Sequence, residues 1–389
     1  MRIALLTTDN RDHQRCYGET VPRFGPAIEA ILSGLSERPE LEVHVISCTQ
    51  KPMRAPAKLS ENTWFHLLHV PKIGWLRTGY QGCVRAVRRK LRELQPDIVH
   101  GQGTERECAI SAVLSGFPNV VTVHGNMGQV AKSLRAPIGS FLWLTARLET
   151  FALRRAGGVF CNSAYTEELV RKNNAQTWRV PNALRPAFFD TPLRLRVRSE
   201  KPILLNVGGI IPYKRQLELL EMAEQLNREG DLFEIVFVSP PPGRSAYARA
   251  FQERLAGLGG RGFARVVTPG NLDELMELYD RASALIHVSM EESFGLVVAE
   301  ALSRNLKFFG VRTGGVPDIA EGVEGAELFA LEDEKSLISA ISRWLESSAP
   351  LPKTAAQEMR MRYHPDVIAA QHVGIYREVI SQGPGPRLN

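Results

Sequence analysis

Long apolar runs are absent from this sequence. No run reaches the about 18 apolar residues that a transmembrane helix needs, so we expect no membrane span. The start, MRIALLTTDN, is typical of a short buried strand and lacks the longer apolar stretch and small-residue cleavage site of a signal peptide. We therefore expect no secretory leader.

Paired cysteines and paired aspartates are also missing. The five cysteines are scattered and none has CxxC spacing, so neither a disulfide framework nor a zinc site is indicated. There is no Asp-x-Asp pair, and the nearest segment, Glu-Asp-Glu at 332–334, is typical of the acidic start of a helix. We expect a protein of the reducing cytoplasm.

The composition that is present is ordinary for a globular protein. The 389 residues are 44% hydrophobic and 23% charged, which excludes a disordered, collagen-like or coiled-coil protein. At about 100–200 residues per domain, this length allows two or three domains.

Basic residues are concentrated in the first half. Residues 1–190 contain 25 Lys/Arg and 16 Asp/Glu, a net charge of +9, whereas residues 191–389 have a net charge of −3. A basic half fits an anionic membrane surface, an acidic substrate or nucleic acid, and it equally fits a solvated surface. The basic residues are not interleaved with exposed aromatics and no reader motif occurs, so we expect no nucleic-acid binding. Weak peripheral contact with an anionic membrane stays open.

Short apolar runs of β type alternate with helical patterns in both halves, which is typical of βαβ units and parallel sheets. The predicted strands are residues 3–6, 43–46, 98–100, 120–124, 159–161 and 178–180, then 203–207, 234–238, 265–268, 284–288 and 307–309. The predicted helices are residues 26–35, 83–94, 105–114, 141–153 and 165–171, then 216–228, 246–255, 272–279 and 296–303. For the apolar segment 138–153, we expect core packing and not membrane insertion, because most of its large apolar residues, Phe141 included, fall on one helical face.

The alternation is interrupted at DTPLRLRVRSEKP, residues 190–202, which is typical of a linker. We predict an α/β fold of two Rossmann-like parallel-sheet domains that face each other across a cleft. The first is 1–190, the linker 191–202 and the second 203–365, followed by a crossing helix and tail, 366–389. Ligands of such sheets bind at the carboxyl ends of the strands.

The first chemical motif is NVGGIIPYKR, after the strand 203–207. Gly208 and Gly209 allow backbone amides to approach a ligand closely. Lys214 opens the next helix in this prediction, so its ammonium and the positive helix end are candidates to meet a diphosphate. The motif is neither GxGxxG nor a Walker loop, and a solvated lysine explains it equally well.

The second motif, HVSMEESFGLVVAE, joins a buried strand to an apolar helix that starts near Gly295. We expect the first amides, those of Phe294, Gly295 and Leu296, to lack partners within the helix and to form an anion site. Glu292 lies at this entry and Glu300 just over two helical turns later. Carboxylates at these positions are suited to gripping sugar or ribose hydroxyls, although Glu292 also simply favours a helix start.

With TGGVPDI at 313–319, these segments resemble family 4 retaining glycosyltransferases of GT-B fold. The resemblance rests on EESFGLVVAEAL, with its two glutamates separated by seven residues, and on the GG-x-P turn; it covers nearly the whole chain. It implies an acceptor-binding first domain and a second domain for a UDP- or GDP-sugar donor. It also implies transfer to an acceptor hydroxyl with retention of anomeric configuration, without a metal or other cofactor.

The resemblance also implies roles for individual residues. Glu300 matches the residue that binds ribose, Glu292 the one that contacts the transferred sugar, and Lys214 a phosphate-binding lysine. His124, in VTVHGNM, matches a histidine that faces the donor sugar. The stretch Ser293, Phe294, Gly295 and Leu296 matches the donors around diphosphate and sugar. The acceptor is a glycan, a lipid-linked sugar or a small molecule.

The sequence departs from the family pattern at several points. Where the family has Gly-Arg, Gly208 is followed by Gly209, and Arg215 is a candidate substitute for the missing phosphate-binding arginine. The segments 182–185 and 24–26 also differ from the family. Two alternatives stay open: another GT-B enzyme, such as a nucleotide-sugar epimerase or phosphorylase, and a catalytically lapsed sugar-nucleotide-binding protein.

Overall fold

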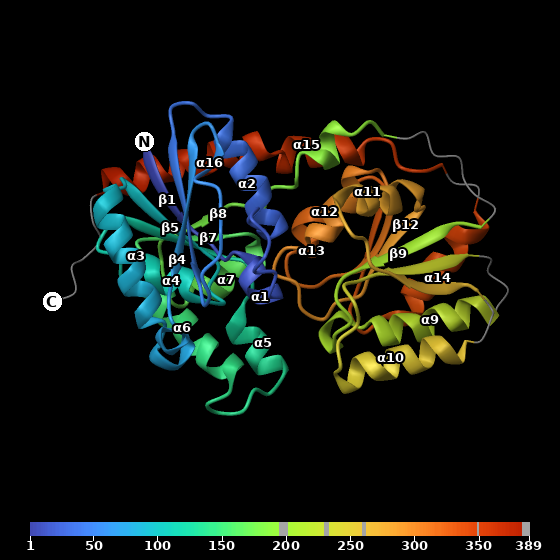
Figure 1. Ribbon diagram of the computed structural model, residues 1–389. Helices are drawn as coiled ribbons and strands as arrows, with labels where there is room; N and C mark the ends of the chain where they lie inside the picture. Colours follow the sequence, from blue (N-terminus) through green and yellow to red (C-terminus); the bar gives the residue numbers. More distant parts are fainter. Residues whose placement is uncertain (194–200, 229–232, 259–261, 348–349, 383–389) are drawn as a thin grey trace. The chain divides into compact units, whose positions relative to one another are not determined.

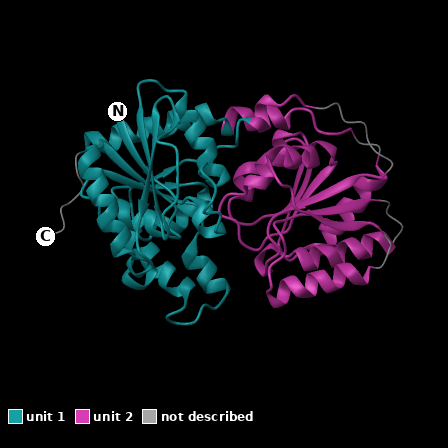
Figure 2. Cartoon of the chain, in the orientation of Figure 1, with its two compact units in different colours: residues 1–186, 363–389 teal, residues 187–362 magenta. Residues whose placement is uncertain are grey.

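A computed structural model describes residues 1–193, 201–228, 233–258, 262–347 and 350–382 (Figure 1). The chain divides into two compact units, Met1–Pro186 with Tyr363–Asn389 (unit 1) and Ala187–Arg362 (unit 2) (Figure 2). These divisions fall a few residues before the predicted boundaries at 190 and 365. Most of the predicted linker, 194–200, and the end of the tail, 383–389, lie outside the described residues.

The described residues of unit 1 form one sheet in the order β3-β4-β2-β1-β5-β6-β7-β8. Neighbouring strands are parallel except β3 and β4, which are antiparallel. The strands are β1 (Arg2–Leu6), β2 (Glu42–Thr49), β3 (Lys58–Ser60), β4 (Thr63–His69), β5 (Ile98–Gln102), β6 (Asn119–Val123), β7 (Val159–Cys161) and β8 (Thr177–Arg179). The edge strand β3 and its neighbour β4 were not predicted, because these partly exposed strands lack the continuous apolar run of a buried parallel strand.

Helices cover both faces of this sheet (Figure 1). Alternate β1 residues point to opposite faces: Ile3 and Leu5 pack with α2 and α16, whereas Ala4 and Leu6 pack with α3 and α4. The helices are α1 (Asn10–Gln14), α2 (Pro26–Ser36), α3 (Gln81–Leu94), α4 (Glu107–Val113), α5 (Met127–Ser133), α6 (Phe141–Leu153), α7 (Ala164–Arg171) and α16 (Pro365–Ser381), with the 3₁₀ turns η1 (Lys72–Gly74) and η2 (Leu76–Thr78).

Helix α6 has the predicted bounds but not the predicted packing. Its buried residues are Thr145, Glu149, Ala152 and Leu153, whereas Phe141 is 56% exposed. The expectation that Phe141 belongs to the core was therefore wrong. Phe141 is the first residue of the helix, directly after the N-cap Ser140, and the buried residues begin one turn later at Thr145.

The C-terminal helix α16 belongs to unit 1. Ile368, Val373 and Tyr376 enter the same apolar cluster as α2, and the two helices lie against each other. Gly34 in α2 is required for this contact, because a Cβ there would lie 2.3 Å from the carbonyl oxygen of Pro365. A helix some 180 residues beyond the last strand of unit 1 thus completes its core.

The sheet of unit 2, within the described residues, is parallel throughout, in the order β11-β10-β9-β12-β13-β14. Its strands are β9 (Ile203–Val207), β10 (Glu234–Val238), β11 (Ala264–Val267), β12 (Ala284–His287), β13 (Lys307–Val311) and β14 (Ala326–Phe329). Its helices are α8 (Ala187–Asp190), η3 (Pro212–Lys214), α9 (Gln216–Arg228), α10 (Ala246–Gly257), α11 (Leu272–Arg281), α12 (Leu296–Ser303), α13 (Val316–Ala320), α14 (Glu334–Glu346) and α15 (Ala355–Tyr363). We had not predicted β14, α8 or α15.

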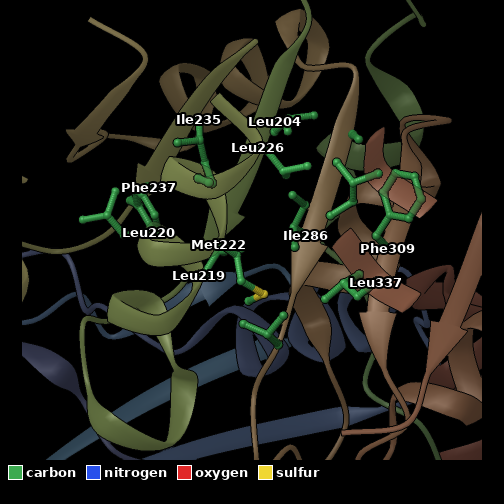
Figure 3. Packing of buried hydrophobic residues seen from close by; sticks show 14 of the residues in the cluster. Leu204, Leu219, Leu220, Met222, Leu226, Ile235, Phe237, Ile286, Phe309 and Leu337 are labelled. Atoms are coloured by element: carbon green, nitrogen blue, oxygen red, sulfur yellow. The ribbon is translucent and has the colours of Figure 1, made fainter. Parts of the chain in front are cut away.

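One face of this sheet packs against α9, α10 and α14. Figure 3 shows strand residues such as Leu204 and Ile286 directed toward Leu219, Met222 and Leu337 of the helices. On the other face of the sheet, α12 contacts β12 and β13. Because β9, β12 and β13 are neighbours and parallel, the loops that follow them leave the same edge of the sheet. Those loops contain the sequence motifs NVGGIIPYKR, HVSMEESFGLVVAE and TGGVPDI.

Candidate functional site

The loops after β9 and β12 bring Lys214 and Glu292 into contact. The Lys214 ammonium donates to Oε2 of Glu292 at 2.5 Å, across 78 positions of sequence. The Nε2 atom of His287, the last residue of β12, lies 3.3 Å from the same oxygen. His287 is 2% exposed, and its Nε2 has no well-aligned hydrogen-bond partner in the described part of the chain. The cluster Lys214–Glu292–His287 therefore offers a ligand a cation, an anion and a buried imidazole nitrogen.

The charges in this cluster follow from their surroundings. Burial alone would raise the pKa of Glu292, but the Lys214 ammonium and the His287 ring outweigh it and hold that pKa at about 2. Burial lowers the pKa of His287, so this ring is neutral at pH 7. At neutral pH, Glu292 is thus an ionised carboxylate that accepts hydrogen bonds and attracts developing positive charge.

Backbone and buried side chains hold the two loops together. The Met290 N–H donates to the Tyr213 carbonyl at 2.7 Å, which joins the lysine loop directly to the glutamate loop. The Ser289 hydroxyl donates to the Glu291 carbonyl at 2.7 Å. These contacts fix the backbone beside Lys214 and Glu292 independently of the ion pair.

A buried glutamine shapes the glycine loop. Gln216, fully buried, donates from Nε2 to the Gly209 carbonyl at 2.7 Å, and its Oε1 accepts from the Ile211 N–H. Gly208 has φ +152°, whereas a Cβ at Gly209 would meet nothing within 4 Å. The open space at Gly209, where the family has arginine, leaves the approach to this loop unobstructed.

The prediction that Lys214 opens a helix was wrong in detail. Lys214 ends the 3₁₀ turn η3, Arg215 takes a left-handed conformation with φ +56°, and α9 begins at Gln216. The left-handed residue interrupts the helical path, so the lysine lies before the helix and not in its first turn. Lys214 acts here through its own charge and its contact with Glu292.

The glycine turn at residues 313–315 contacts the backbone of the loop that contains Glu292. The Gly315 N–H donates to the Glu292 carbonyl at 2.9 Å, and the Thr313 hydroxyl donates to the Met290 carbonyl at 3.0 Å. A Cβ on Gly314 would lie 1.7 Å from the Glu292 carbonyl oxygen, and its φ is +50°. Glycine at 314 is therefore a steric requirement of the glutamate loop.

Helix α12 begins at Leu296, as predicted from the sequence. Gly295 is the N-cap with φ +106°, and its carbonyl already accepts from the N–H groups of Val298 and Ala299. The N–H groups of Gly295, Leu296 and Val297 make no backbone hydrogen bond in the described residues. Phe294 is buried by its side chain, with Ser293 before it. Two of the three predicted donors, the N–H groups of Gly295 and Leu296, thus lie at the helix start beside Glu292, with the Val297 N–H next to them.

Glu300 is buried inside unit 2, with a side chain that is 4% exposed. The Tyr279 hydroxyl of α11 donates to its Oε2 at 2.9 Å, and Tyr279 itself is fully buried. Tyr279 also packs edge-on against Phe188. A solvated surface glutamate, the alternative interpretation of this residue, does not describe Glu300.

We expect Tyr279→Phe to weaken binding of a sugar nucleotide more than turnover. The change removes the hydroxyl that orients Glu300 and keeps the buried ring, so stability falls by about 1 kcal/mol. If Glu300 holds the ribose, KM for the donor rises several-fold while kcat stays within about twofold. Steady-state kinetics check this, with Tyr247→Phe, a tyrosine bonded to Glu218 elsewhere in the unit, as the control. An unchanged donor KM would contradict the role of Glu300.

Arg215 is held away from this cluster by another partner. Its guanidinium forms an ion pair with Glu334 in the first turn of α14. As predicted, the acidic segment 332–334 starts that helix, with Asp333 as the N-cap. Arg215 therefore already has an acidic partner outside the Lys214–Glu292–His287 cluster. In the described residues, no group of three or more His, Cys, Asp or Glu side chains is arranged to hold a metal ion.

His124, the predicted catalytic residue of unit 1, follows β6. Its Nε2 pairs with Oε1 of Gln102 at 2.9 Å, and Gln102 in turn contacts the buried His100. Burial lowers the pKa of His124 to about 4, against a weaker opposing contact from Asn182. His124 is therefore neutral at pH 7, and its Nε2 forms a hydrogen bond with Gln102.

This polar network continues into the C-terminal helix. His100 contacts Thr122 at 2.7 Å and the Tyr376 hydroxyl at 2.5 Å, and His372 donates from Nδ1 to the Ile368 carbonyl. Burial lowers the pKa of His372 to about 4. His100 is fully buried and lies inside the core of unit 1.

We expect acid to destabilise unit 1 through His372. A pKa lowered from 6.5 to about 4 on folding means that the unfolded chain binds more protons below pH 6.5, so stability present above that pH is lost as the pH falls toward 4. This loss is about 2 kcal/mol at pH 5. Urea unfolding at pH 7.5 and 5.0 should show this loss in wild type and in the exposed-site control His13→Gln, and the total loss should be about 2 kcal/mol smaller in His372→Phe, in which His124 still contributes its own loss. Equal pH dependence in all three proteins would contradict the assignment.

A polar cavity lies beside His124 in unit 1. Its volume is about 210 Å³, and its lining residues come from the loops after β1 and β5: Thr8, Asn10, His13, Gln102, Glu105 and Arg106. The Glu105 carboxyl fits between two glycines, since a Cβ on Gly103 would come within 2.4 Å of it and one on Gly125 within 3.0 Å. Burial raises the pKa of Glu105 to about 7. This carboxyl can therefore both donate and accept hydrogen bonds near neutral pH.

Comparisons with known proteins cover both units. The profile described as "Glycosyltransferase Family 4" matches residues 28–188, and that described as "Glycosyl transferases group 1" matches residues 192–362. The two matches follow one another along the chain and include both loops of the cluster. The chain belongs to the family 4 glycosyltransferases.

Two curated proteins are similar in sequence to this family 4 glycosyltransferase. It is 27% identical over 251 residues to a protein named sulfoquinovosyl transferase SQD2 from Arabidopsis thaliana, which is 59% of this chain and 45% of that one. It is 25% identical over 374 residues to one named D-inositol 3-phosphate glycosyltransferase from Acidothermus cellulolyticus, which is 92% of this chain and 78% of that one. The chain thus spans less than half of the first relative.

Solved structures show the same GT-B fold. The sucrose-phosphate synthase from Thermosynechococcus elongatus superposes with a TM-score of 0.74 at 18% identity, covering 98% of this chain and all of that one. The prediction of two parallel-sheet domains of GT-B type is thereby confirmed. No helix in the described part of this glycosyltransferase is both long and apolar enough to cross a bilayer.

Sequence reasoning overlooked several residues of the site. His287 ends the strand ALIH and was noted without a role, whereas Gln216, Ser289 and Tyr279 were not singled out. A histidine at a strand end next to a glutamate loop was a usable signal. Gln216 and Tyr279 gave none, because each acts through a buried contact with a residue from another segment.

Proposed function

We propose that this family 4 glycosyltransferase moves a sugar from a nucleotide-diphosphate sugar to an acceptor hydroxyl, with retention and without a metal. The observation that carries the proposal is the Lys214–Glu292–His287 cluster next to the unbonded amides of residues 295–297. A cation and backbone donors suit a diphosphate, and an ionised carboxylate suits the sugar. Retention follows from the resemblance and is part of the proposal.

Each group has a defined task in this proposal. The bond from the anomeric carbon to the phosphate oxygen breaks, leaving negative charge on the diphosphate and positive character on the sugar. Lys214 and the amides stabilise the first, and Glu292 the second. The acceptor oxygen bonds to the anomeric carbon, and its proton passes to the departing phosphate oxygen. Glu300 holds the ribose, and a role for His124 toward the sugar rests on the resemblance.

We propose the polar cavity of unit 1 as the acceptor site. Its carboxyl, amide, imidazole and guanidinium groups suit a ligand rich in hydroxyls, such as a sugar or a cyclitol. Glu105 accepts from an acceptor hydroxyl when ionised. Because its pKa is about 7, acceptor binding through that contact strengthens as the pH rises from 6 to 8.

The test uses the full chain with a panel of UDP- and GDP-sugars in the presence of EDTA. We expect one donor to raise the melting temperature and to release its nucleotide diphosphate when an acceptor is added, with a product of the donor's anomeric configuration by NMR. An epimerase would convert the donor without release, and a phosphorylase would need inorganic phosphate. A thermal shift without turnover would identify a lapsed binding protein, and inhibition by EDTA would contradict metal independence.

A further inference from the structure

The segment that joins α5 to α6 has an unusual surface. It projects from unit 1 beyond the body of the sheet and its helices (Figure 1). Three large apolar side chains in it are exposed: Ile138 by 86%, Phe141 by 56% and Leu134 by 43%. Exposed apolar residues are ordinary when scattered, but three within eight positions at a projecting tip form a patch.

The charges around this patch are of one sign. Lys132, Arg135 and Arg147 are exposed in and beside the segment. No aspartate or glutamate occurs between Glu107 and Glu149, and Glu149 is buried. The tip therefore combines exposed apolar side chains with uncompensated positive charge, which is the composition of a surface that enters the headgroup region of an anionic membrane.

Hydrogen bonds anchor both ends of this segment. Buried Glu149 accepts hydrogen bonds from the N–H groups of Met127 and Gly128 and from the Thr104 hydroxyl at 2.6 Å, which ties α5 to α6. Ser140 caps α6 by accepting from the Trp143 N–H. Gly139 provides a left-handed turn with φ +80° just before the cap. The apolar side chains are thus presented by a defined turn between two anchored helices.

We propose that residues 132–141 are a membrane-docking tip that binds bilayers containing anionic lipid. Ile138 and Phe141 insert at the interface, with Leu134 beside them, while Lys132 and Arg135 contact the lipid phosphates. The wider positive charge of residues 1–190 attracts the same surface at longer range. The proposal does not depend on the transferase activity, since it concerns side chains outside the Lys214–Glu292–His287 cluster.

Sedimentation of the full chain with vesicles tests this proposal. We expect at least tenfold stronger binding to phosphatidylcholine vesicles with 30% phosphatidylglycerol than to phosphatidylcholine alone, and a marked loss between 50 and 300 mM salt. Ile138→Ser with Phe141→Ser should lower binding tenfold or more. Lys132→Ser with Arg135→Ser should lower it several-fold and reduce the salt dependence.

Matched controls separate the tip from general surface properties. Arg88→Ser with Arg89→Ser removes the same charge from the exposed face of α3, and Val21→Ser removes an apolar side chain that is 70% exposed. Both should bind vesicles within about twofold of wild type, and all variants should keep the wild-type circular dichroism. Three results would each overturn the proposal. They are equal losses of vesicle binding in the tip and control variants, no binding by wild type, and tip substitutions that change self-association but not sedimentation with vesicles.

Discussion

Replacing Lys214 with methionine should lower kcat with a nucleotide-sugar donor by about 10²–10³-fold, the cost of removing one group that stabilises charge developing in a transition state. Methionine keeps the length and apolar stem of lysine and removes the ammonium that lies 2.5 Å from Glu292. Donor KM should rise as well, because the same cation meets the diphosphate of the bound donor.

The pH dependence of this variant gives an independent test. Without Lys214 the buried Glu292 carboxylate loses the principal group that holds its pKa at about 2, so that pKa rises. As the pH is lowered, the residual activity of this variant should therefore be lost at a higher pH than the activity of wild type. Lys214→Met with Glu292→Gln should cost less than the sum of the single variants, because the two groups are coupled.

The control is Lys335→Met, which removes an exposed lysine from α14 in the same unit. It should leave kcat and donor KM within about twofold of wild type. A Lys214→Met enzyme with kcat/KM close to that of wild type would contradict the assignment of the cluster as the donor site. If circular dichroism shows that Lys214→Met is not folded, Lys214→Arg replaces it in the test.

Gly314→Ala should damage activity more than any other single methyl group added to unit 2. The new Cβ would lie 1.7 Å from the Glu292 carbonyl oxygen, a contact that forces the glutamate loop to move. The φ of +50° adds roughly 1–2 kcal/mol of strain for a residue with a side chain. We expect kcat/KM to fall at least tenfold and the free energy of unfolding to fall by about 3 kcal/mol.

Gly322→Ala is the matched control for this change. Gly322 also has a positive φ, +76°, but a Cβ there would meet nothing within 4 Å. It should lose roughly 1–2 kcal/mol of stability and keep wild-type kinetics. Urea unfolding and steady-state kinetics of both variants separate backbone strain from displacement of Glu292. Equal kinetics in the two variants would show that the Gly314 turn does not position the glutamate.

Local patterns predicted much of the fold. The bounds of β9, β10, α9, α12 and α6 agree with the predicted ranges, because each combines a clear apolar period with a turn or a capping residue at its ends. The missed strands β3, β4 and β14 are short or partly exposed, and they lie at a sheet edge (β3 and β14) or next to one (β4), where that period is weak.

The site shows the same division. Glu292, Glu300 and Lys214 were predicted from motifs, and the structure places Lys214 against Glu292. The predicted start of α12 is confirmed, and the N–H groups of Gly295 and Leu296 from the predicted set make no backbone hydrogen bond in the described residues. Arg215 was predicted as a phosphate ligand from its neighbour alone, but its partner Glu334 lies 119 positions away.

By itself, the sequence determined the alternation of strands and helices, the identity of the charged residues and the loops on which they lie, because periodicity and turn chemistry act over a few neighbouring residues. The tertiary structure decided which of these residues meet. Lys214 reaches Glu292 because β9 pairs with β12, Gly314 is confined because its turn packs against Glu292, and Glu300 is oriented by Tyr279 of another helix. Such contacts depend on strand order and helix packing, which arise from interactions summed over the whole unit.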